Sequence, residues 1–394
     1  MNRKRIGIIG FGARMSGLWS LVIKQAPDFD FVALVDPYPE SAKGCLEHFG
    51  YNFDDVVLYS DVDEMLDKAD LDGVFIASNC DTHTQYAVKV LNKGLPLYLE
   101  KPVATNYDDL YKLQEAGRGK EDNVVISFPL RVTPVARVMK EKIAQGAIGE
   151  PNFLEAWCYP NYGDVYYRQW YRNENIIQGL WLQKATHDFD YITNILGQEP
   201  VMLAAMNQKQ VFKGDMPEGL YCVDCDKFET CPQGPYHMYL YRHEIDKIPA
   251  RGDRKAFPYR CQFAKDTGNE DAGSAIIRYS SGMIASYDQC FFARNDAGCR
   301  GCKVVGYDGT IEFDWRDEKV KYYSHRSPLV ETIDTTSTAS HGGGDDILID
   351  SFVHLVRGNG KSVANLTDGL RSVYMCLKAK DSCRENKFME LNFK

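Results

Sequence analysis

The segment that most constrains the fold is the apolar run Ile6-Gly-Ile-Ile-Gly10, which leads directly into Gly10-Phe-Gly12-Ala-Arg-Met15-Ser-Gly17. Apolar residues at near-helical spacing follow from Leu18 to Ile23. This order predicts a buried strand, a glycine-rich turn and a helix whose N-terminus faces a pyrophosphate. Gly10 permits the tight turn, and Gly12 lets backbone N–H groups approach the phosphates. The predicted cofactor contacts in this turn are Gly10, Phe11, Gly12, Ala13, Arg14 and Met15.

A second apolar strand, residues 31–35, ends in Asp36, which lies 24 residues beyond Gly12. A carboxylate at this place accepts hydrogen bonds from an adenosine ribose and repels a 2′-phosphate. The sequence therefore favours NAD over NADP, with Arg14 as the one cation that would suit the phosphorylated cofactor. Met15 replaces the third glycine of the usual fingerprint, so a glycine turn in another α/β protein stays as the alternative.

Strands and helices then alternate along the chain, with strands expected at residues 56–59, 73–77 and 95–100 and helices at 62–68 and 84–93. Such alternation predicts a parallel, doubly wound sheet that binds ligands at the carboxyl ends of its strands. Two polar segments follow strand ends, at residues 78–83 and 100–102. We place their polar residues beside the cofactor, with bracing of the following helix as the alternative for the histidine: Ser78, Asn79, His83, Glu100 and Lys101.

Beyond Pro151 the pattern changes to β-type runs at residues 152–157, 201–206, 274–279 and 283–288. Hairpin turns are expected at 280–282 and around Asp308-Gly309. A run of strands after an alternating half predicts two fused domains. One face of an open sheet must be covered, so we expect a homo-oligomer, a dimer or a tetramer. Residues 335–344 suggest a crossover linker, followed by amphipathic helices at 345–357 and 368–383.

The composition excludes several classes of protein. A chain of 394 residues suits two domains, and its net charge of −9 with scattered Lys and Arg argues against a nucleic-acid partner. No apolar run approaches the length needed to span a bilayer, so no membrane partner is expected. The basic start at Met1–Arg5 runs straight into the first strand, which favours a cytoplasmic protein over a secreted one. Its 12 cysteines should then be mostly reduced.

Glu100-Lys101-Pro102, about 90 residues beyond the glycine-rich turn, belongs to a set of motifs that runs along the chain. The others are Gly146-Ala-Ile-Gly-Glu150, Lys184-Ala-Thr-His187-Asp-Phe-Asp190, Gly306-Tyr-Asp-Gly-Thr-Ile-Glu312 and Gly342-Gly-Gly-Asp345. In combination they resemble the glucose–fructose oxidoreductase/inositol dehydrogenase/MocA family. The resemblance implies an α/β Rossmann domain over residues 1–128 and an α+β domain with a large, open, mostly antiparallel sheet over 129–344. The last helices, 345–394, would return to the first domain.

The same resemblance implies that Lys101 lies beside the nicotinamide ribose and the reacting hydroxyl, and that His187 contacts that hydroxyl. Gln183 stands where the family commonly has Asp, which removes a carboxylate, and Asn79 replaces the usual Pro. His187 is the candidate base, since an unperturbed imidazole titrates near neutral pH. A helix over residues 180–196 would put Lys184, His187 and Asp190 on one face, where Asp190 orients the imidazole and both lysines favour an alkoxide. A structural His187–Asp190 pair is the alternative.

Residues 159–172 are rich in aromatic side chains and precede the helix of His187. Flat rings stack on sugar C–H surfaces, and charged residues of this segment, Asp164, Arg168 and Arg172, could bind hydroxyls. An ordered loop packed on the sheet is the alternative. The predicted substrate residues are Tyr162, Tyr166, Arg168, Trp170, Gln183 and Asp190.

A cysteine-rich insertion, residues 215–262, contains Cys222-x2-Cys225-x5-Cys231 and then Cys261. Four thiolates at such spacing can close a tetrahedral, structural zinc site, which would pin an insertion without an apolar core of its own. Free thiols or a disulfide are the alternatives. Cys299 and Cys302 are treated as ordinary residues.

The leading functional hypothesis is an NAD-dependent oxidoreductase that passes a hydride between nicotinamide and a hydroxyl carbon of a sugar, glycoside or polyol. The resemblance also covers glycosidases that oxidise C3 transiently, eliminate the aglycone and reduce again, so this alternative stays open. A non-catalytic NAD-sensing regulator is a third, and the presence of both Lys101 and His187 argues against it.

Overall fold

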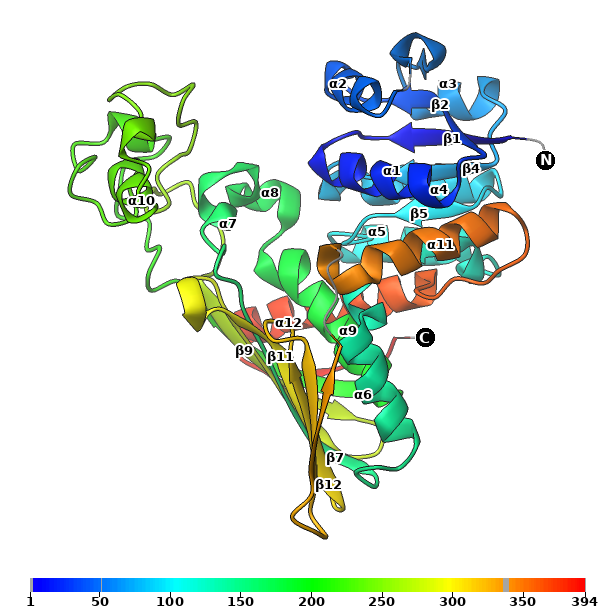
Figure 1. The fold of residues 1–394 in the computed structure, drawn as a ribbon, viewed down its shortest axis with the longest axis vertical. Coiled ribbons are helices and arrows are strands. Elements are labelled where there is room, and N and C mark those ends of the chain that lie inside the picture. Colours follow the sequence, from blue (N-terminus) through cyan, green and yellow to red (C-terminus); the bar gives the residue numbers. More distant parts are fainter. Residues whose placement is uncertain (1–2, 51, 336–339, 394) are drawn as a thin grey trace.

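The computed structural model describes residues 3–50, 52–335 and 340–393, and contains two sheets with different strand directions (Figure 1). The first is a six-stranded, wholly parallel sheet in the order β3-β2-β1-β4-β5-β6. This is the doubly wound order expected for a dinucleotide-binding fold, so the predicted fold class is confirmed. Its strands are β1 (Lys4–Ile9), β2 (Phe29–Val35), β3 (Val57–Leu58), β4 (Gly73–Ile76), β5 (Leu97–Leu99) and β6 (Val124–Ile126).

Helices flank both faces of this sheet, as alternation of strand and helix requires. Short polar side chains begin two of them. Asp61 accepts a hydrogen bond from Glu64 N at the start of α3, and Asn106 accepts one from Asp109 N at the start of α5. The helices of this half are α1 (Ala13–Gln25), α2 (Glu40–His48), α3 (Val62–Lys68), α4 (His83–Asn92) and α5 (Tyr107–Gly117).

The second sheet has nine strands in the order β14-β13-β12-β11-β7-β10-β9-β8-β15 and is antiparallel except for the pair β7 and β10. Helices α6 (Pro134–Ala144), α9 (Thr186–Leu196) and α12 (Leu366–Glu385) cover one face, and within the described residues no helix covers the other (Figure 1). The strands are β7 (Pro151–Tyr159), β8 (Pro200–Gln208), β9 (Ala272–Tyr279), β10 (Ile284–Cys290), β11 (Cys299–Gly306), β12 (Gly309–Asp314), β13 (Lys319–Ser324), β14 (Val330–Asp334) and β15 (Met389–Glu390).

The chain returns to the first sheet at its C-terminal end. Helix α11 (Gly344–Val356) packs on α1, and the Phe352 ring lies 4.5 Å from that of Phe75 on β4. Helix α12 begins with a capping box made by Asn365 and Asp368, and packs on both α5 and α9. The C-terminal helices therefore tie the two sheets together. The centre of the expected crossover linker, residues 336–339, lies outside the described residues.

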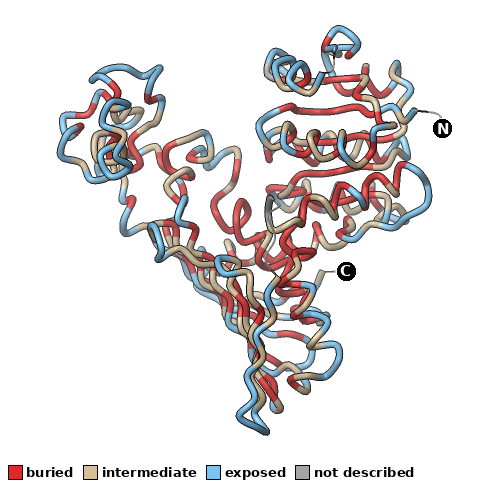
Figure 2. Tube along the Cα trace, in the orientation of Figure 1, coloured by how far each residue is buried: buried red, intermediate tan, exposed pale blue. Residues whose placement is uncertain are grey.

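Residues 215–262 form a separate lobe around α10 (Pro235–Tyr241), in which exposed and partly buried residues predominate (Figure 2). The expectation that this insertion lacks an apolar core is wrong. Val223, Phe228 and Phe257 are buried together, because aromatic rings from α10 and from the returning strand-like segment enclose them. The lobe thus carries a small hydrophobic core of its own.

Short helical turns connect the larger elements. Among the described helices, none is long and apolar enough to cross a membrane. The short elements are α7 (Val165–Arg168), α8 (Glu174–Ile177), η1 (Phe53–Asp55), η2 (Cys80–Thr82), η3 (Glu121–Asn123), η4 (Pro129–Val132), η5 (Trp170–Arg172), η6 (Trp181–Ala185), η7 (Cys222–Asp224), η8 (Ile245–Lys247), η9 (Asn295–Ala297) and η10 (Ser340–Gly343).

Candidate active site

The glycine-rich turn between β1 and α1 leaves room for a ligand at the helix N-terminus. Gly10 has a φ of +82°, and a Cβ there would lie 2.6 Å from Ser78 Cα, so only glycine fits this close approach to the end of β4. A Cβ on Gly12, the N-cap of α1, would meet nothing within 4 Å. The positive end of a 13-residue helix is therefore open to an anion such as a pyrophosphate.

Asp36 lies at the end of β2 beside this turn. Its two carboxylate oxygens accept hydrogen bonds from the N–H groups of Phe11 and Tyr38, each at 2.6 Å. These bonds fix a partly exposed carboxylate next to the open helix end, as a ribose-binding acid requires. The side chains of Phe11 and Met15 are buried in the core, so these two predicted contacts reach a cofactor only through their backbone.

The guanidinium of Arg14 is bound by acidic partners after β5 and on α11, and not by Asp36. Its guanidinium donates to Glu100 at 2.7 Å and to both oxygens of Asp345 on α11. It also donates to the Ser127 hydroxyl at 2.9 Å. Burial alone would raise the pKa of Glu100, but the charges of Arg14 and Lys101 outweigh it and hold that pKa below its ordinary value. Arg14 and Glu100 therefore form an internal ion pair that joins the glycine-rich turn, β5 and α11.

His83 is buried and braces two loops, which is the alternative to a cofactor contact that the sequence left open. The ring is only 1% exposed, with Nδ1 2.8 Å from Pro102 O and Nε2 3.0 Å from Ser78 O. Burial lowers the pKa of this imidazole below its ordinary value. The ring links the loops that follow β4 and β5, and so holds Lys101 in register with the end of β4.

Lys101, which follows β5, reaches across to the second half of the chain. Its Nζ donates to Gln183 O at 3.0 Å, while the thiol of Cys80 donates to Gln183 Oε1 at 3.4 Å. Burial lowers the pKa of the Lys101 ammonium to about 8. A lysine with such a pKa is poised between its charged and neutral forms near the pH of the cell, which is the property expected of a group that handles protons.

Gln183 and Lys184 lie in η6, a single π-helical turn that precedes α9. The Lys184 ammonium donates to the Tyr162 hydroxyl at 2.6 Å and lies 4.9 Å from the centre of that ring. The expectation of one regular helix with Lys184, His187 and Asp190 on a single face is wrong. The wider turn adds a residue and rotates the side chains before it relative to those after it. Such turns are frequent at functional sites.

His187 is the one residue between 181 and 193 that is not fully buried. Its ring packs edge-on against Phe128, at 6.0 Å, just after β6. The imidazole therefore emerges from an otherwise enclosed helix, one turn beyond the carbonyl that Lys101 binds. The structure thus brings the loop after β5 together with the turn that precedes α9.

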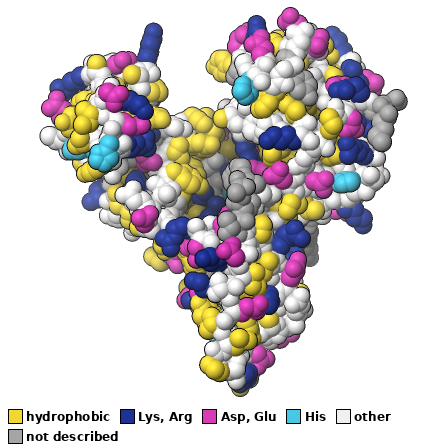
Figure 3. All heavy atoms as spheres, viewed as in Figure 1, with side chains coloured by type: hydrophobic (Ala, Val, Ile, Leu, Met, Phe, Trp, Pro, Cys, Tyr) yellow, Lys and Arg dark blue, Asp and Glu magenta, His cyan; other side chains and the backbone are white. Residues whose placement is uncertain are grey.

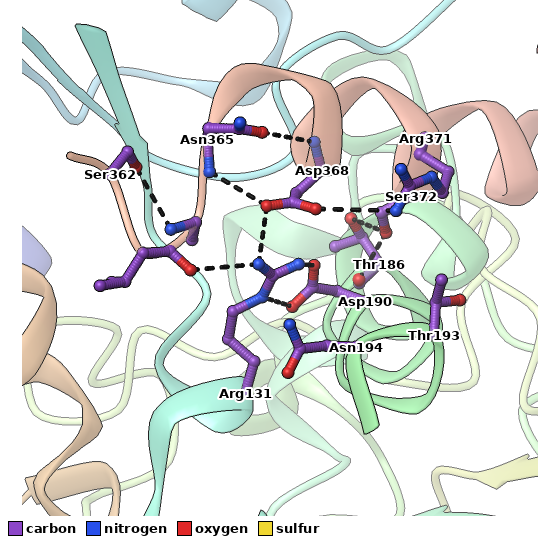
Figure 4. A network of polar contacts seen from close by, with 12 residues as sticks. Arg131, Thr186, Asp190, Thr193, Asn194, Ser362, Asn365, Asp368, Arg371 and Ser372 are labelled. Carbon is purple, nitrogen blue, oxygen red and sulfur yellow. Dashed lines mark hydrogen bonds and ion pairs between the residues drawn. The ribbon is translucent and has the colours of Figure 1, made fainter. Parts of the chain in front are cut away.

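Asp190 belongs to a structural network instead of orienting the imidazole (Figure 4). Both of its oxygens accept from the guanidinium of Arg131, with Nε at 2.9 Å, and the same guanidinium donates to Asp368 at the start of α12. Arg131 and Asp190 are 6% and 3% exposed. The predicted substrate contact is therefore corrected to a buried ion pair that locks α9 to η4 and α12.

Two further groups near the site were missed from the sequence. Asp188 is fully buried and accepts two hydrogen bonds from Arg300 on β11 and one from the Tyr287 hydroxyl on β10. This network fixes the residue next to His187. The second group is Cys80, whose thiol donates to Gln183. Its place in the polar segment after β4 was the one sign in the sequence that it lies near the site.

The aromatic segment forms a wall that is exposed in part. Tyr162 and Trp170 are 52% and 45% exposed, whereas Tyr166 is buried. Figure 3 shows hydrophobic side chains gathered over the α7–α8 region, in the hollow between the insertion and the first half. Arg168 is buried and donates to Gln233 O at 2.6 Å, so its guanidinium is partly used to hold the insertion.

The predicted zinc site is not supported. Within the described residues, no group of three or more His, Cys, Asp or Glu side chains is placed to hold a metal ion. All 12 cysteines are free of disulfide bonds. The small apolar core of the insertion provides the stabilisation that the metal was invoked to supply.

Comparisons with known families cover most of the chain. A model described as an oxidoreductase family with an NAD-binding Rossmann fold matches residues 4–128, and the model of that family's C-terminal alpha/beta domain matches residues 140–391. The protein YteT of Bacillus subtilis (strain 168) is 28% identical over 390 residues, which cover 89% of this chain and 88% of YteT.

Other relatives match over a shorter length. Myo-inositol 2-dehydrogenase of Thermotoga maritima is 24% identical over 196 residues, 50% of this chain and 55% of that enzyme. Among solved structures, levoglucosan dehydrogenase in complex with NADH and levoglucosan has a TM-score of 0.75 at 16% identity, with 99% and 100% of the two chains covered. At such identity the likeness establishes the fold alone.

Proposed function

The chain belongs to the glucose–fructose oxidoreductase/inositol dehydrogenase/MocA family of oxidoreductases, and from this premise we propose that it transfers a hydride between NAD and a hydroxyl-bearing carbon of a sugar, glycoside or polyol. The observation that carries the proposal is the contact between Lys101 Nζ and Gln183 O. It brings the lysine after β5 and the helix of His187 to one place, in front of the carboxyl ends of the parallel strands.

The residues present fit NAD. The open N-terminus of α1 at Gly12 suits the pyrophosphate, and the fixed carboxylate of Asp36 suits the adenosine ribose. Arg14 is committed to Glu100 and Asp345, so its charge is not available to a 2′-phosphate, and this supports NAD over NADP. When bound, the nicotinamide supplies the centre that accepts or returns the hydride.

In the proposed mechanism, His187 takes the hydroxyl proton as the hydride leaves the substrate carbon, and returns it in the reverse direction. The ammonium groups of Lys101 and Lys184 stabilise the negative charge that develops on the substrate oxygen. Asp188, held by Arg300 and Tyr287, positions the start of α9 and hence the imidazole. Lys184 is held in turn by the Tyr162 hydroxyl.

The proposed substrate class rests on the aromatic segment of residues 159–172 and on the named activities of related proteins. Exposed Tyr162 and Trp170 offer flat apolar faces beside polar groups, which suits a carbohydrate. Relatives named as dehydrogenases of inositol and of levoglucosan support a sugar, glycoside or polyol.

We also propose that the open face of the nine-stranded sheet is an interface between copies of the chain. Phe153, Ile276 and Ile284 are 38%, 53% and 40% exposed on this face, and Ile284 pairs in register with Phe153. An apolar patch on adjacent central strands is unfavourable in water and is satisfied by a second copy. Twelve unpaired cysteines support a reducing, cytoplasmic location.

The test is a panel of polyols, sugars and glycosides with NAD, followed by nicotinamide absorbance and by product analysis. The proposal expects net NADH formation with at least one substrate, and loss of that activity in His187→Ala but not in the surface control Lys112→Ala. Glycoside cleavage without net NADH would instead establish the redox-neutral glycosidase. NAD binding without any turnover would establish a sensor.

A further inference from the structure

A cavity lies between the aromatic segment and the end of the insertion, lined by residues 168–176 and 258–268. Its volume is about 660 Å³, within the range of small-molecule sites. Trp170 lines it with a partly exposed ring, and the loop around Pro258 to Gly268 forms the opposite wall. A saccharide unit therefore has both the space and a flat surface for stacking.

The walls of this cavity are cationic although the chain as a whole has a net charge of −9. Four basic side chains line it, Arg168, Arg172, Arg260 and Lys265, against two acidic ones, Asp266 and Glu174. Asp164, which lies 3.3 Å from Arg168 Nε, adds one further negative charge behind that arginine. An excess of positive charge therefore faces the cavity.

Two of these cations are available to a ligand. Lys265 is exposed and has no ion-pair partner among the described residues. Arg260 is 42% exposed at its side chain and reaches only one oxygen of Asp266, at 3.4 Å, a carboxylate that it shares with Arg172 at 2.8 Å. The single carboxylate of Asp266 therefore pairs with two guanidinium groups, and the charge of Arg260 is only partly compensated. Arg260 can thus bind a further anion.

Arg172 adds a further positive charge that is only partly compensated. Its side chain is buried, with 5% of the residue exposed, and its Nε has no hydrogen-bond acceptor among the described residues. Burial lowers the pKa of this guanidinium, and Arg260 nearby adds to the effect, so the two cations are not fully compensated. Because the Nε atom is itself buried, a ligand in the cavity meets the positive charge of Arg172 and not this donor.

The cavity is connected to the catalytic groups through the aromatic segment. Lys184 holds Tyr162, the ring of Tyr166 lies 5.5 Å from that of Tyr171, and Tyr171 stacks on Trp170 at 3.9 Å. Helix α8, which lines the cavity, also packs on η2 at the end of β4. These contacts join the wall of the cavity to the segment that holds Lys184 and to the end of β4.

We propose that this cavity is a subsite for the carboxylate of an acidic sugar unit, so that the preferred substrate is a uronate-containing glycoside; this rests on the function proposed above. Arg260 and Lys265 bind the carboxylate, and Trp170 stacks on the ring that carries it. A planar guanidinium matches both a carboxylate and a phosphate ester in geometry, so a sugar phosphate is the competing ligand that the experiment must separate from the uronate.

The experiment is calorimetric titration of the full chain, saturated with NADH, with matched pairs of disaccharides. Each pair has one acid and one neutral member that differ only at C6: digalacturonate with galactobiose, and cellobiouronic acid with cellobiose. We expect an acid to bind about tenfold or more tightly than its neutral partner. In the variant Arg260→Gln/Lys265→Ala, the dissociation constants of the acid and of its neutral partner should differ by no more than about twofold. The control variant Lys112→Ala/Arg118→Gln removes the same number of positive charges from α5 and its C-terminal end, and it should keep the tenfold difference.

Equal binding of acid and neutral sugars across the pairs, or an unchanged preference in the Arg260→Gln/Lys265→Ala variant, overturns the proposal. Tighter binding of glucose 6-phosphate than of glucuronate overturns the choice of a carboxylate. All three outcomes leave the proposed function intact if neutral glycosides are oxidised. Failure of the chain to bind NADH would refute the proposed function itself, and this is measured separately by nicotinamide fluorescence.

Discussion

Replacing Lys101 by Met should stabilise the protein at neutral pH while it removes activity. The pKa of Lys101 falls from its ordinary 10.5 to about 8, so the folded protein disfavours the charged form that predominates at pH 7. A fully enclosed ammonium with that pKa would cost roughly 3 kcal/mol. Since part of the Lys101 side chain still reaches solvent, we take the cost of burying its charge as about 2 kcal/mol. Loss of the hydrogen bond to Gln183 O costs about 1 kcal/mol, which leaves a net gain of about 1 kcal/mol.

The gain should depend on pH in a definite direction. Below pH 8 the lysine is charged in both the folded and the unfolded chain, so the full cost of burying the charge is present. Between pH 8 and 10.5 the unfolded chain binds more protons, and wild-type stability rises. Near pH 10.5 Lys101→Met should therefore be less stable than wild type by about 1 kcal/mol, the cost of the lost hydrogen bond alone.

The assay is urea unfolding of the NAD-free protein at pH 7 and at pH 10, with the exposed Lys112→Met as the control. In parallel, turnover should fall by about 10²–10³-fold, since a charge that stabilises the developing alkoxide is lost. A variant that is less stable than wild type at pH 7, or whose stability difference is the same at both pH values, would refute the reasoning.

Four further changes test other parts of the account. His187→Ala should lower kcat by about 10²–10⁴-fold with NAD affinity changed less than twofold, and an unchanged kcat contradicts its role as base. Asp36→Ala should weaken NAD binding by about tenfold and narrow the preference over NADP, as measured by fluorescence titration of both cofactors. Arg131→Met leaves Asp190 buried without its partner and should lower the free energy of unfolding by about 3–5 kcal/mol, so a loss below 1 kcal/mol would argue against the network. Ile276→Glu should release monomers from a wild-type oligomer in light scattering, and a monomeric wild type would refute the interface.

The parts of the fold that depend on local patterns could be predicted from the sequence. The first sheet could be predicted because its signals lie within short stretches of sequence. These signals are the alternation of strands and helices, the glycine-rich turn and the acid at Asp36. Lys101 and the helix of His187 are far apart in the sequence, and their approach was expected only because both motifs belong to the family that the chain resembles.

The contacts that local patterns did not show share a different cause. Partners of Arg14, His83 and Asp190 come from distant segments, so no local spacing could show that Asp345, Pro102 and Arg131 would occupy these side chains. The π-helical turn at Trp181–Ala185 changes the direction of Lys184 without any mark in the periodicity. The cysteine spacing suggested a metal, but the core of the insertion depends on aromatic residues from both of its ends.

The most direct test of the central claim is a crystal structure of the complex with NADH. The account predicts the pyrophosphate on the Gly10–Gly12 turn, and the Lys101 ammonium and the His187 imidazole on the same face of the nicotinamide ring, where both reach the place of a substrate carbon about 3.5 Å from C4. A dinucleotide bound elsewhere, or Lys101 and His187 on different sides of the nicotinamide ring, would contradict it.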